Sequence, residues 1–290
     1  MPQPLPLMLE RLLAPKRITA RHARLAAQRP VVLMGRGKSG TRLLSLACGQ
    51  LGVALGITPR LPAADIDHRP FRQAVKALAQ RNFAAANAAA VNVKDQQLFE
   101  YRMEQAWRML QRLSPGAPAW GWKWPETYLI APIVHAAFPQ GRFIHMVRDG
   151  RDLAFKRHLT DDMRRPLGRT MLTHLGLTQE PRHIQAARSW QFQVEAYLSF
   201  AEQLPAGQRM ELTYEGLCRQ PVETVARIAD FLQLGFPPAS REWVQKHIVA
   251  RDLSQYRQAP PDLVKDVEGL IGGTLVKLGY TLAHTTRQSA

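Results

Sequence analysis

A lysine inside a glycine-rich turn is the feature of this sequence that points most directly to chemistry. The turn follows the apolar run Val31-Val32-Leu33-Met34 and reads Gly35-Arg36-Gly37-Lys38-Ser39-Gly40-Thr41-Arg42. A strand that passes through such a turn into a helix aims several backbone N–H groups and the helix N-terminus at one point. Lys38 adds a positive charge at that point. We therefore expect this segment to hold a phosphate-like anion.

Three nucleotide-binding loops could contain these glycines, besides a plain turn between a strand and a helix. Gly35, Gly37 and Gly40 match the dinucleotide fingerprint, but the nearest acids that could hold a ribose, Asp65 and Asp67, come late and in a proline-rich loop. The nucleoside-triphosphatase loop requires Lys-Ser/Thr after its last glycine, where this chain has Thr41-Arg42. The third chemistry uses a lysine within the loop, directly before Ser-Gly-Thr.

That third pattern resembles the sulfotransferases that use 3′-phosphoadenosine 5′-phosphosulfate (PAPS). Lys38-Ser39-Gly40-Thr41 matches their 5′-phosphosulfate loop, and Gly35-Arg36-Gly37 is a common lead-in in bacterial members. The resemblance implies that Lys38 stabilises the leaving phosphate and that the loop binds the donor. The donor-binding residues expected in the loop are Arg36, Gly37, Lys38, Ser39, Gly40, Thr41 and Arg42.

Further motifs extend the resemblance over most of the chain. Arg148, in Val147-Arg148-Asp149-Gly150-Arg151-Asp152, matches the arginine that holds the 3′-phosphate, while Lys156 occupies the position of the family's serine. Tyr214 matches the tyrosine at the adenosine, and Arg257 matches loosely a basic loop that closes over PAPS. Each of these residues also has a plainer interpretation. Arg148 could form an ion pair with Asp149 or Asp152. Tyr214 could be a half-buried strand tyrosine, and Arg257 a surface arginine.

The proton of the acceptor requires a base. Glu126 is the leading candidate because it follows Lys123-Trp124-Pro125, where cytosolic animal members carry a Lys-Thr-His segment with a catalytic histidine. Lys123 would then help to stabilise charge. The alternative is that Glu126 caps the helix that it begins. Other branches of the family place an acid after the first helix, so the runner-up bases are Asp65, Asp67 and His68.

The order of elements predicts an α/β fold, with one parallel sheet between two layers of helices. Strands are expected at 31–35, 119–124, 142–147 and 209–214, and helices at 38–52, 71–90, 95–113, 126–138, 183–204 and 221–233. Ligands of such sheets bind beyond the carboxyl ends of the strands. Gly35, Pro125, Arg148 and Tyr214 all fall at or just after strand ends. This is the P-loop-like sulfotransferase fold that the resemblance implies.

We expect a single domain over residues 1–290. Residues 1–29 form a helical extension, whose apolar run 7–13 and following basic residues suggest either packing on the domain or peripheral membrane contact. Residues 160–182 are polar and irregular, and are expected to form a mobile lid or acceptor loop. Trp120, Trp122 and Trp124 either line an acceptor cleft or belong to the core.

Composition limits the classes of partner. The 290 residues carry a formal net charge of +16, and 46% are hydrophobic. The basic residues are dispersed, without a nucleic-acid motif, so no specific nucleic acid is expected. The two cysteines form no metal or redox motif, and no run is long enough to cross a membrane, which favours a cytoplasmic protein.

The resemblance thus implies a PAPS-dependent sulfotransferase that needs no metal. Its acceptor would be a hydroxyl or amine of a carbohydrate, lipid or small molecule. The alternatives are a non-catalytic basic module that binds polyanions or a membrane surface, and a dinucleotide-binding oxidoreductase.

Overall fold

A parallel sheet places the glycine-rich loop at the centre of the molecule. The computed structural model describes residues 15–61, 63–84, 91–249 and 253–282. Within these residues, five parallel strands form one sheet in the order β2-β3-β1-β4-β5. They are β1 (Val31–Met34), β2 (Val53–Ala54), β3 (Ala119–Lys123), β4 (Arg142–Val147) and β5 (Arg209–Thr213). Because β1 is the middle strand, the loop that follows it leaves the middle of the sheet edge.

Strand β1 shows why these residues form a central strand. All four of its side chains are buried, as expected for a strand covered on both faces. Val32 and Met34 join one apolar cluster, and Val31 and Leu33 join another. In β4, Phe143 joins the first of these clusters, and Ile144 and Met146 join the second.

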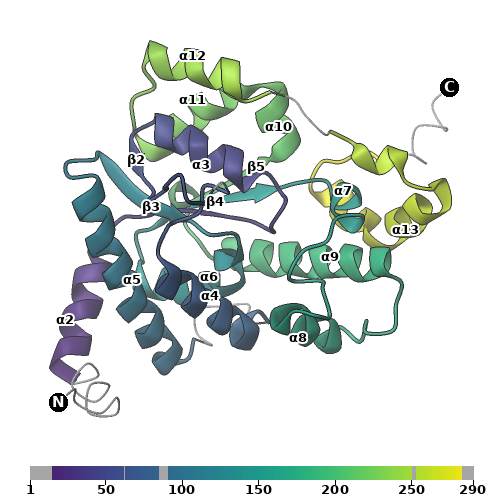
Figure 1. Cartoon of the computed structure of the whole chain (residues 1–290), viewed down its shortest axis with the longest axis horizontal. Coiled ribbons are helices and arrows are strands. Elements are labelled where there is room, and N and C mark those ends of the chain that lie inside the picture. Colours follow the sequence, from purple (N-terminus) through teal and green to yellow (C-terminus); the bar gives the residue numbers. More distant parts are fainter. Residues whose placement is uncertain (1–14, 62, 85–90, 250–252, 283–290) are drawn as a thin grey trace.

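Helices form a layer on each face of the sheet (Figure 1). One layer contains α3 (Thr41–Gln50), α10 (Tyr214–Arg219), α11 (Pro221–Leu232) and α12 (Pro238–His247). The other contains α4 (Arg69–Asn82), α5 (Val93–Leu113), α6 (Ala131–Ala137) and α9 (Arg182–Ala201). The short helix α7 (Gly150–Ala154) and α13 (Pro261–Lys277) pack on α9 around a third apolar cluster. The predicted α/β architecture with two helical layers is confirmed.

One strand was missed and two local expectations are corrected. Strand β2 was not predicted, because two residues are too few to show an alternating pattern. The predicted helix 126–138 begins as the 3-10 helix η2 (Pro125–Ile130) and continues as α6. Segment 160–182 is not irregular throughout, because it contains α8 (Pro166–His174), where Pro166 occupies the helix start that proline favours.

The three tryptophans in and directly after β3 belong mainly to the core. Trp122 is fully buried, and its ring meets Phe71 edge-on with the centroids 5.7 Å apart. Trp120 packs on Trp107, also with a centroid separation of 5.7 Å, and Trp124 is almost fully buried. These rings therefore stabilise the contact between the sheet and α4 and α5, and the expectation that they line an acceptor cleft is not supported.

The N-terminal extension packs on the domain where the structure describes it. Helix α2 (Pro15–Ala26) lies against α5, and Arg21 Nε donates to Glu104 Oε2 over 3.1 Å. The apolar run 7–13, which suggested membrane contact, lies outside the described residues. In the part of the chain that the structure describes, no helix has both the length and the apolar character required to cross a bilayer.

Candidate functional site

The glycine-rich loop turns from β1 into α3 through two left-handed residues. Lys38 has a φ of 76° and Gly40 a φ of 90°. A left-handed lysine costs roughly 1–2 kcal/mol of backbone strain, and such strain is characteristic of ligand sites. Gly40 is the N-cap of α3, and no side chain caps this helix. The exposed Lys38 side chain and the helix N-terminus therefore concentrate positive potential in one place.

Tyr214 and Arg148, far apart in the sequence, meet at this loop. Gly40 leaves room for the Tyr214 ring, since a Cβ at Gly40 would lie 2.2 Å from Tyr214 Cδ2. The Arg148 guanidinium lies 4.4 Å from the centroid of the same ring, and its Nη1 donates to the Lys38 carbonyl over 3.5 Å. The structure thus brings together three of the predicted donor-binding motifs.

Arg148 also makes the ion pair considered in its plainer reading. Its Nη2 lies 2.8 Å from Asp152 Oδ2, while Asp149 pairs with Arg151. The second Asp152 oxygen accepts a hydrogen bond from the Tyr256 backbone N–H at 2.9 Å. Asp152 therefore fixes the guanidinium at the carboxyl end of β4, where it still lines the cavity beside the loop.

The loop forms one wall of a cavity of 800 Å³. This volume lies within the range of small-molecule and cofactor sites. Other walls come from the ends of β3 and β4, from the start of α10 and from the end of α12. The predicted residues that line the cavity are Gly37, Lys38, Gly40, Thr41, Arg42, Asp65, Lys123, Arg148 and Tyr214.

Arg36 is placed differently from its prediction. Its side chain is completely buried and forms an ion pair with Asp161, which Arg182 Nη2 also contacts at 2.9 Å. In the described chain, Arg36 is not part of the cavity lining. Gly37 lines the cavity, whereas the Arg36 side chain is buried against Asp161. The Arg36 side chain therefore anchors the segment around Asp161 to the loop, and its role toward the donor stays a prediction.

His158 belongs to this anchored segment and packs directly on the loop. A Cβ at Gly37 would lie only 1.9 Å from His158 Nε2. His158 Nδ1 lies 2.9 Å from Thr160 Oγ1, and its Nε2 lies 3.6 Å from Glu126 Oε1. Burial, together with the charges of Arg36, Lys38 and Lys76, holds the pKa of His158 well below its usual value, so the imidazole is neutral.

Glu126 is a buried carboxyl with one oxygen that lacks a hydrogen-bond partner among the described residues. Burial raises its pKa to about 7. In the described chain it lines neither this cavity nor the second one considered below, whereas its neighbour His158 lines both. His158 is therefore a residue that lines both cavities and also contacts Glu126.

The runner-up bases have separate structural roles. Asp65 lies in the cavity, where it pairs with the buried ammonium of Lys123, which also donates to the Ala63 carbonyl over 2.6 Å. Burial lowers the pKa of Lys123, and Asp65 opposes this shift. Asp67 accepts from Thr58 Oγ1 at 2.6 Å, and His68 caps α4 by accepting from the Phe71 N–H at 3.2 Å. Of the three, Asp65 alone reaches the cavity.

Lys156, Ser39 and Arg257 are not part of the cavity lining in the described chain. Lys156 is half-buried, and Ser39 is buried within the loop. Arg257 is exposed on the 3-10 helix η4 (Gln255–Gln258). The roles of these residues toward the donor stay predictions.

The family follows from a sequence comparison. A profile of the sulfotransferase family matches residues 30–238, from the start of β1 to the start of α12. The chain belongs to the sulfotransferase family. The matched part of this family member contains the glycine-rich loop, Glu126, Arg148 and Tyr214, whereas Arg257 lies beyond it.

Solved structures support the fold of this sulfotransferase-family protein. Sulfotransferase STF9 from Mycobacterium avium superposes with a TM-score of 0.56 at 17% identity, covering 91% of this chain and 80% of that one. The sulfotransferase domain from the curacin biosynthetic pathway gives a TM-score of 0.52 at 17% identity, covering 88% and 99%. At these identities the likeness shows a shared fold. No curated protein matches the chain significantly.

Sequence reasoning missed the aromatic side of the cavity in this family member. Trp243 and His247 of α12 line it, with their rings stacked at a centroid distance of 4.5 Å and an interplanar angle of 16°. Their separation of one helical turn could have indicated a shared face. The approach of His158 to Gly37 could not be predicted from the sequence, because it depends on the buried pair of Arg36 and Asp161.

Substitution of Gly40 tests the packing of the loop in this family member. Gly40→Ala is expected to lower the free energy of unfolding by about 2–4 kcal/mol, because it adds a strained φ and a clash with Tyr214. Gly49→Ala is the matched control in the same helix, since a Cβ there meets no atom within 4 Å. It is expected to stabilise the protein by up to about 1 kcal/mol. Denaturant unfolding of both variants is the measurement, and equal stabilities would contradict the packing described.

Proposed function

We propose that this protein transfers the sulfuryl group of PAPS to an acceptor hydroxyl. The observation that carries the proposal is the meeting of the glycine-rich loop, Arg148 and Tyr214 around one cavity. An exposed lysine and an uncapped helix N-terminus suit a 5′-phosphosulfate, and a guanidinium next to them suits a second phosphate. The family of the chain supports the same reaction.

The donor would lie with its charged end at the loop. The 5′-phosphosulfate faces Lys38 and the N-terminus of α3, and the 3′-phosphate faces Arg148. The stacked rings of Trp243 and His247, which line the same cavity, offer a flat surface for the adenine. The volume of 800 Å³ is sufficient for a ligand of this size.

The reaction breaks one bond of sulfur and forms another. The acceptor oxygen attacks the sulfur in line, while the bridging oxygen leaves with the 5′-phosphate. Negative charge grows on that bridging oxygen, where Lys38 and the α3 amides stabilise it. The same groups bind less strongly to the ground state, where the charge is more dispersed, so they lower the barrier rather than only the dissociation constant.

His158 and Glu126 provide the path for the acceptor proton. His158 is neutral, lines the cavity at Gly37 and can accept the proton at Nε2 as the acceptor oxygen bonds to sulfur. The Glu126 carboxylate, 3.6 Å away, stabilises the imidazolium that results. Glu126 therefore acts through His158, which refines its sequence-based assignment as the base.

Selective stabilisation by the nucleotide product tests the donor assignment. At equal concentrations, 3′,5′-diphosphoadenosine is expected to raise the thermal unfolding midpoint by several degrees, because it binds the native state alone. ATP and NAD should give much smaller shifts, since neither places phosphates at both Arg148 and the loop. A larger shift with NAD would favour an oxidoreductase. Equal small shifts with all three nucleotides, and salt-sensitive binding to polyanions, would favour a non-catalytic basic module.

A further inference from the structure

The 800 Å³ cavity at the glycine-rich loop is called the donor cavity from here on. A second cavity adjoins it at His158. It lies between α4 and the segment that leads from Arg157 into α8, and has a volume of 670 Å³. His158 lines both cavities. A ligand in the second cavity therefore borders the same imidazole as a donor held at the loop, which is the arrangement that in-line transfer requires of an acceptor.

The lining of this second cavity is cationic. Lys76, Arg157 and Arg165 contribute to it and are exposed. In the described chain, the side chains of these three residues make no hydrogen bond or ion pair with an acid; the Lys76 ammonium lies 5.1 Å from the centroid of the Trp124 ring. The one acid of the lining, Asp162, is already paired, since Arg164 Nε and Nη2 donate to it over 2.9 Å and 2.8 Å. The cavity therefore keeps an excess of positive charge.

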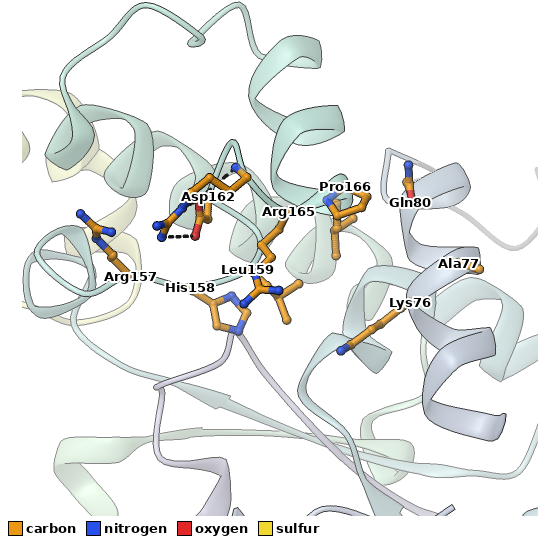
Figure 2. A pocket seen from close by; sticks show the side chains of 11 residues that line it. Lys76, Ala77, Gln80, Arg157, His158, Leu159, Asp162, Arg165 and Pro166 are labelled. Carbon is orange, nitrogen blue, oxygen red and sulfur yellow. Dashed lines mark hydrogen bonds and ion pairs between the residues drawn. The ribbon is translucent and has the colours of Figure 1, made fainter. Parts of the chain in front are cut away.

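Two of the cations are directed toward the junction of the cavities. Figure 2 shows the Lys76 side chain reaching from α4 toward His158, and the Arg165 side chain reaching toward it from the opposite wall. Arg157 points away from Lys76 in the same view. Dispersed surface cations account for the net positive charge of the protein. Lys76 and Arg165, in contrast, converge inside a cavity beside the neutral His158, and such an arrangement is a site for an anion.

We propose that the second cavity binds the acceptor, and that the acceptor is a hydroxyl compound with a carboxylate, phosphate or sulfate group. Arg165 and Lys76 hold this anionic group, and the hydroxyl then lies against His158. Arg165 can bind two oxygens of such a group at once, whereas Lys76 acts as a point charge. The proposal rests on the proposed function, because the hydroxyl has to meet the sulfuryl group at the loop. It disfavours amine acceptors, which are cations at neutral pH.

Binding of matched probes tests the charge preference. The protein is first saturated with 3′,5′-diphosphoadenosine, so that the donor cavity is filled, and is then titrated calorimetrically with glucose, glucuronate and glucose 6-phosphate. We expect at least one charged probe to bind about tenfold or more tightly than glucose, with an affinity that falls as salt is added. The two charged probes distinguish a carboxylate from a phosphate site.

Two variants assign that preference to this cavity. Arg165→Gln and Lys76→Gln are each expected to weaken binding of the charged probe by about tenfold. Arg112→Gln, at an exposed position of α5 outside the cavity, removes the same charge and should leave binding unchanged. Affinity for 3′,5′-diphosphoadenosine should stay within about twofold in all three variants, since none of these residues lines the donor cavity.

The outcomes separate this inference from the proposed function. If no charged probe binds more tightly than glucose, or if Arg165→Gln and Lys76→Gln behave like Arg112→Gln, the assignment of an anionic acceptor is overturned even though the donor nucleotide binds. If 3′,5′-diphosphoadenosine does not bind, the proposed function fails. The same titrations without nucleotide then still decide whether the cavity binds anions through Arg165 and Lys76.

Discussion

Lys38→Gly is expected to lower kcat for sulfuryl transfer at least about 100-fold, without loss of stability. The substitution removes the ammonium that, in the proposed function, faces the bridging oxygen. It also relieves a left-handed backbone, because Lys38 has a φ of 76° that glycine adopts at no steric cost. The protein should therefore unfold at the same denaturant concentration as the wild type, or at a slightly higher one. A variant that is inactive and stable separates the chemical role of Lys38 from any role in folding.

Gln233→Gly is the matched control for this substitution. Gln233 also has a positive φ, 58°, but lies exposed at the end of α11 and away from the cavity. The Gln233→Gly substitution should relieve a similar backbone strain and leave kcat unchanged. If Lys38→Gly kept wild-type kcat at saturating PAPS, the stabilisation of the leaving group would have to come from elsewhere in the site.

Glu126→Gln is expected to lower kcat about 10²–10⁴-fold, with little change in affinity for 3′,5′-diphosphoadenosine. The amide has almost the same shape but cannot stabilise an imidazolium at His158. In the wild type, kcat/KM should fall about tenfold per pH unit below about pH 7, as the carboxylate becomes protonated. The pH profile of Glu126→Gln should lack this inflection. If the role of Glu126 were purely structural, another group would cause the inflection and the variant would keep it.

Stability gives an independent measure of the same carboxyl. Its pKa is about 7 in the folded protein against an ordinary value of 4.5, so the native state holds the proton more tightly than the unfolded chain. Its contribution to stability is full below pH 4.5 and is lost as pH rises to 7. The difference between these two pKa values corresponds to about 3 kcal/mol in the free energy of unfolding. Relative to wild type, Glu126→Gln should therefore be more stable at pH 8 than at pH 4 by about that amount.

Asp65→Asn is the control that distinguishes the two candidate bases. Asp65 lines the donor cavity and pairs with Lys123, so its substitution should alter donor affinity more than the pH profile. Unchanged turnover in Glu126→Gln, together with a large loss in Asp65→Asn, would contradict the role of Glu126 and move the base to Asp65.

The loop and its neighbours could be predicted because their evidence is local. Four apolar residues before a glycine turn indicate a buried strand, and in a parallel sheet the residues after each strand meet at one edge. This reasoning placed Lys38, Arg148 and Tyr214 in one site, and the structure brings them together.

The other site residues depend on contacts that are distant in sequence. Arg36 was assigned to the donor because it lies in the loop, but a buried pair with Asp161 holds it underneath. The same pair brings His158 onto Gly37, so the segment after Arg148 presents a histidine to the cavity rather than Lys156. The spacing of motifs along the chain carries no information about such a pair. Trp243 reaches the site through the packing of α12 on α3, which is also non-local.

Transfer of labelled sulfate tests the central claim most directly. Wild-type protein and Lys38→Gly are incubated with [³⁵S]PAPS and hydroxyl compounds, including neutral and anionic members of matched pairs, and the labelled product is separated from the donor. We predict acceptor-dependent transfer by the wild type, and a rate at least about 100-fold lower in the equally stable variant. Equal rates for the two proteins, or no transfer by a wild type that also fails to bind 3′,5′-diphosphoadenosine, would contradict it.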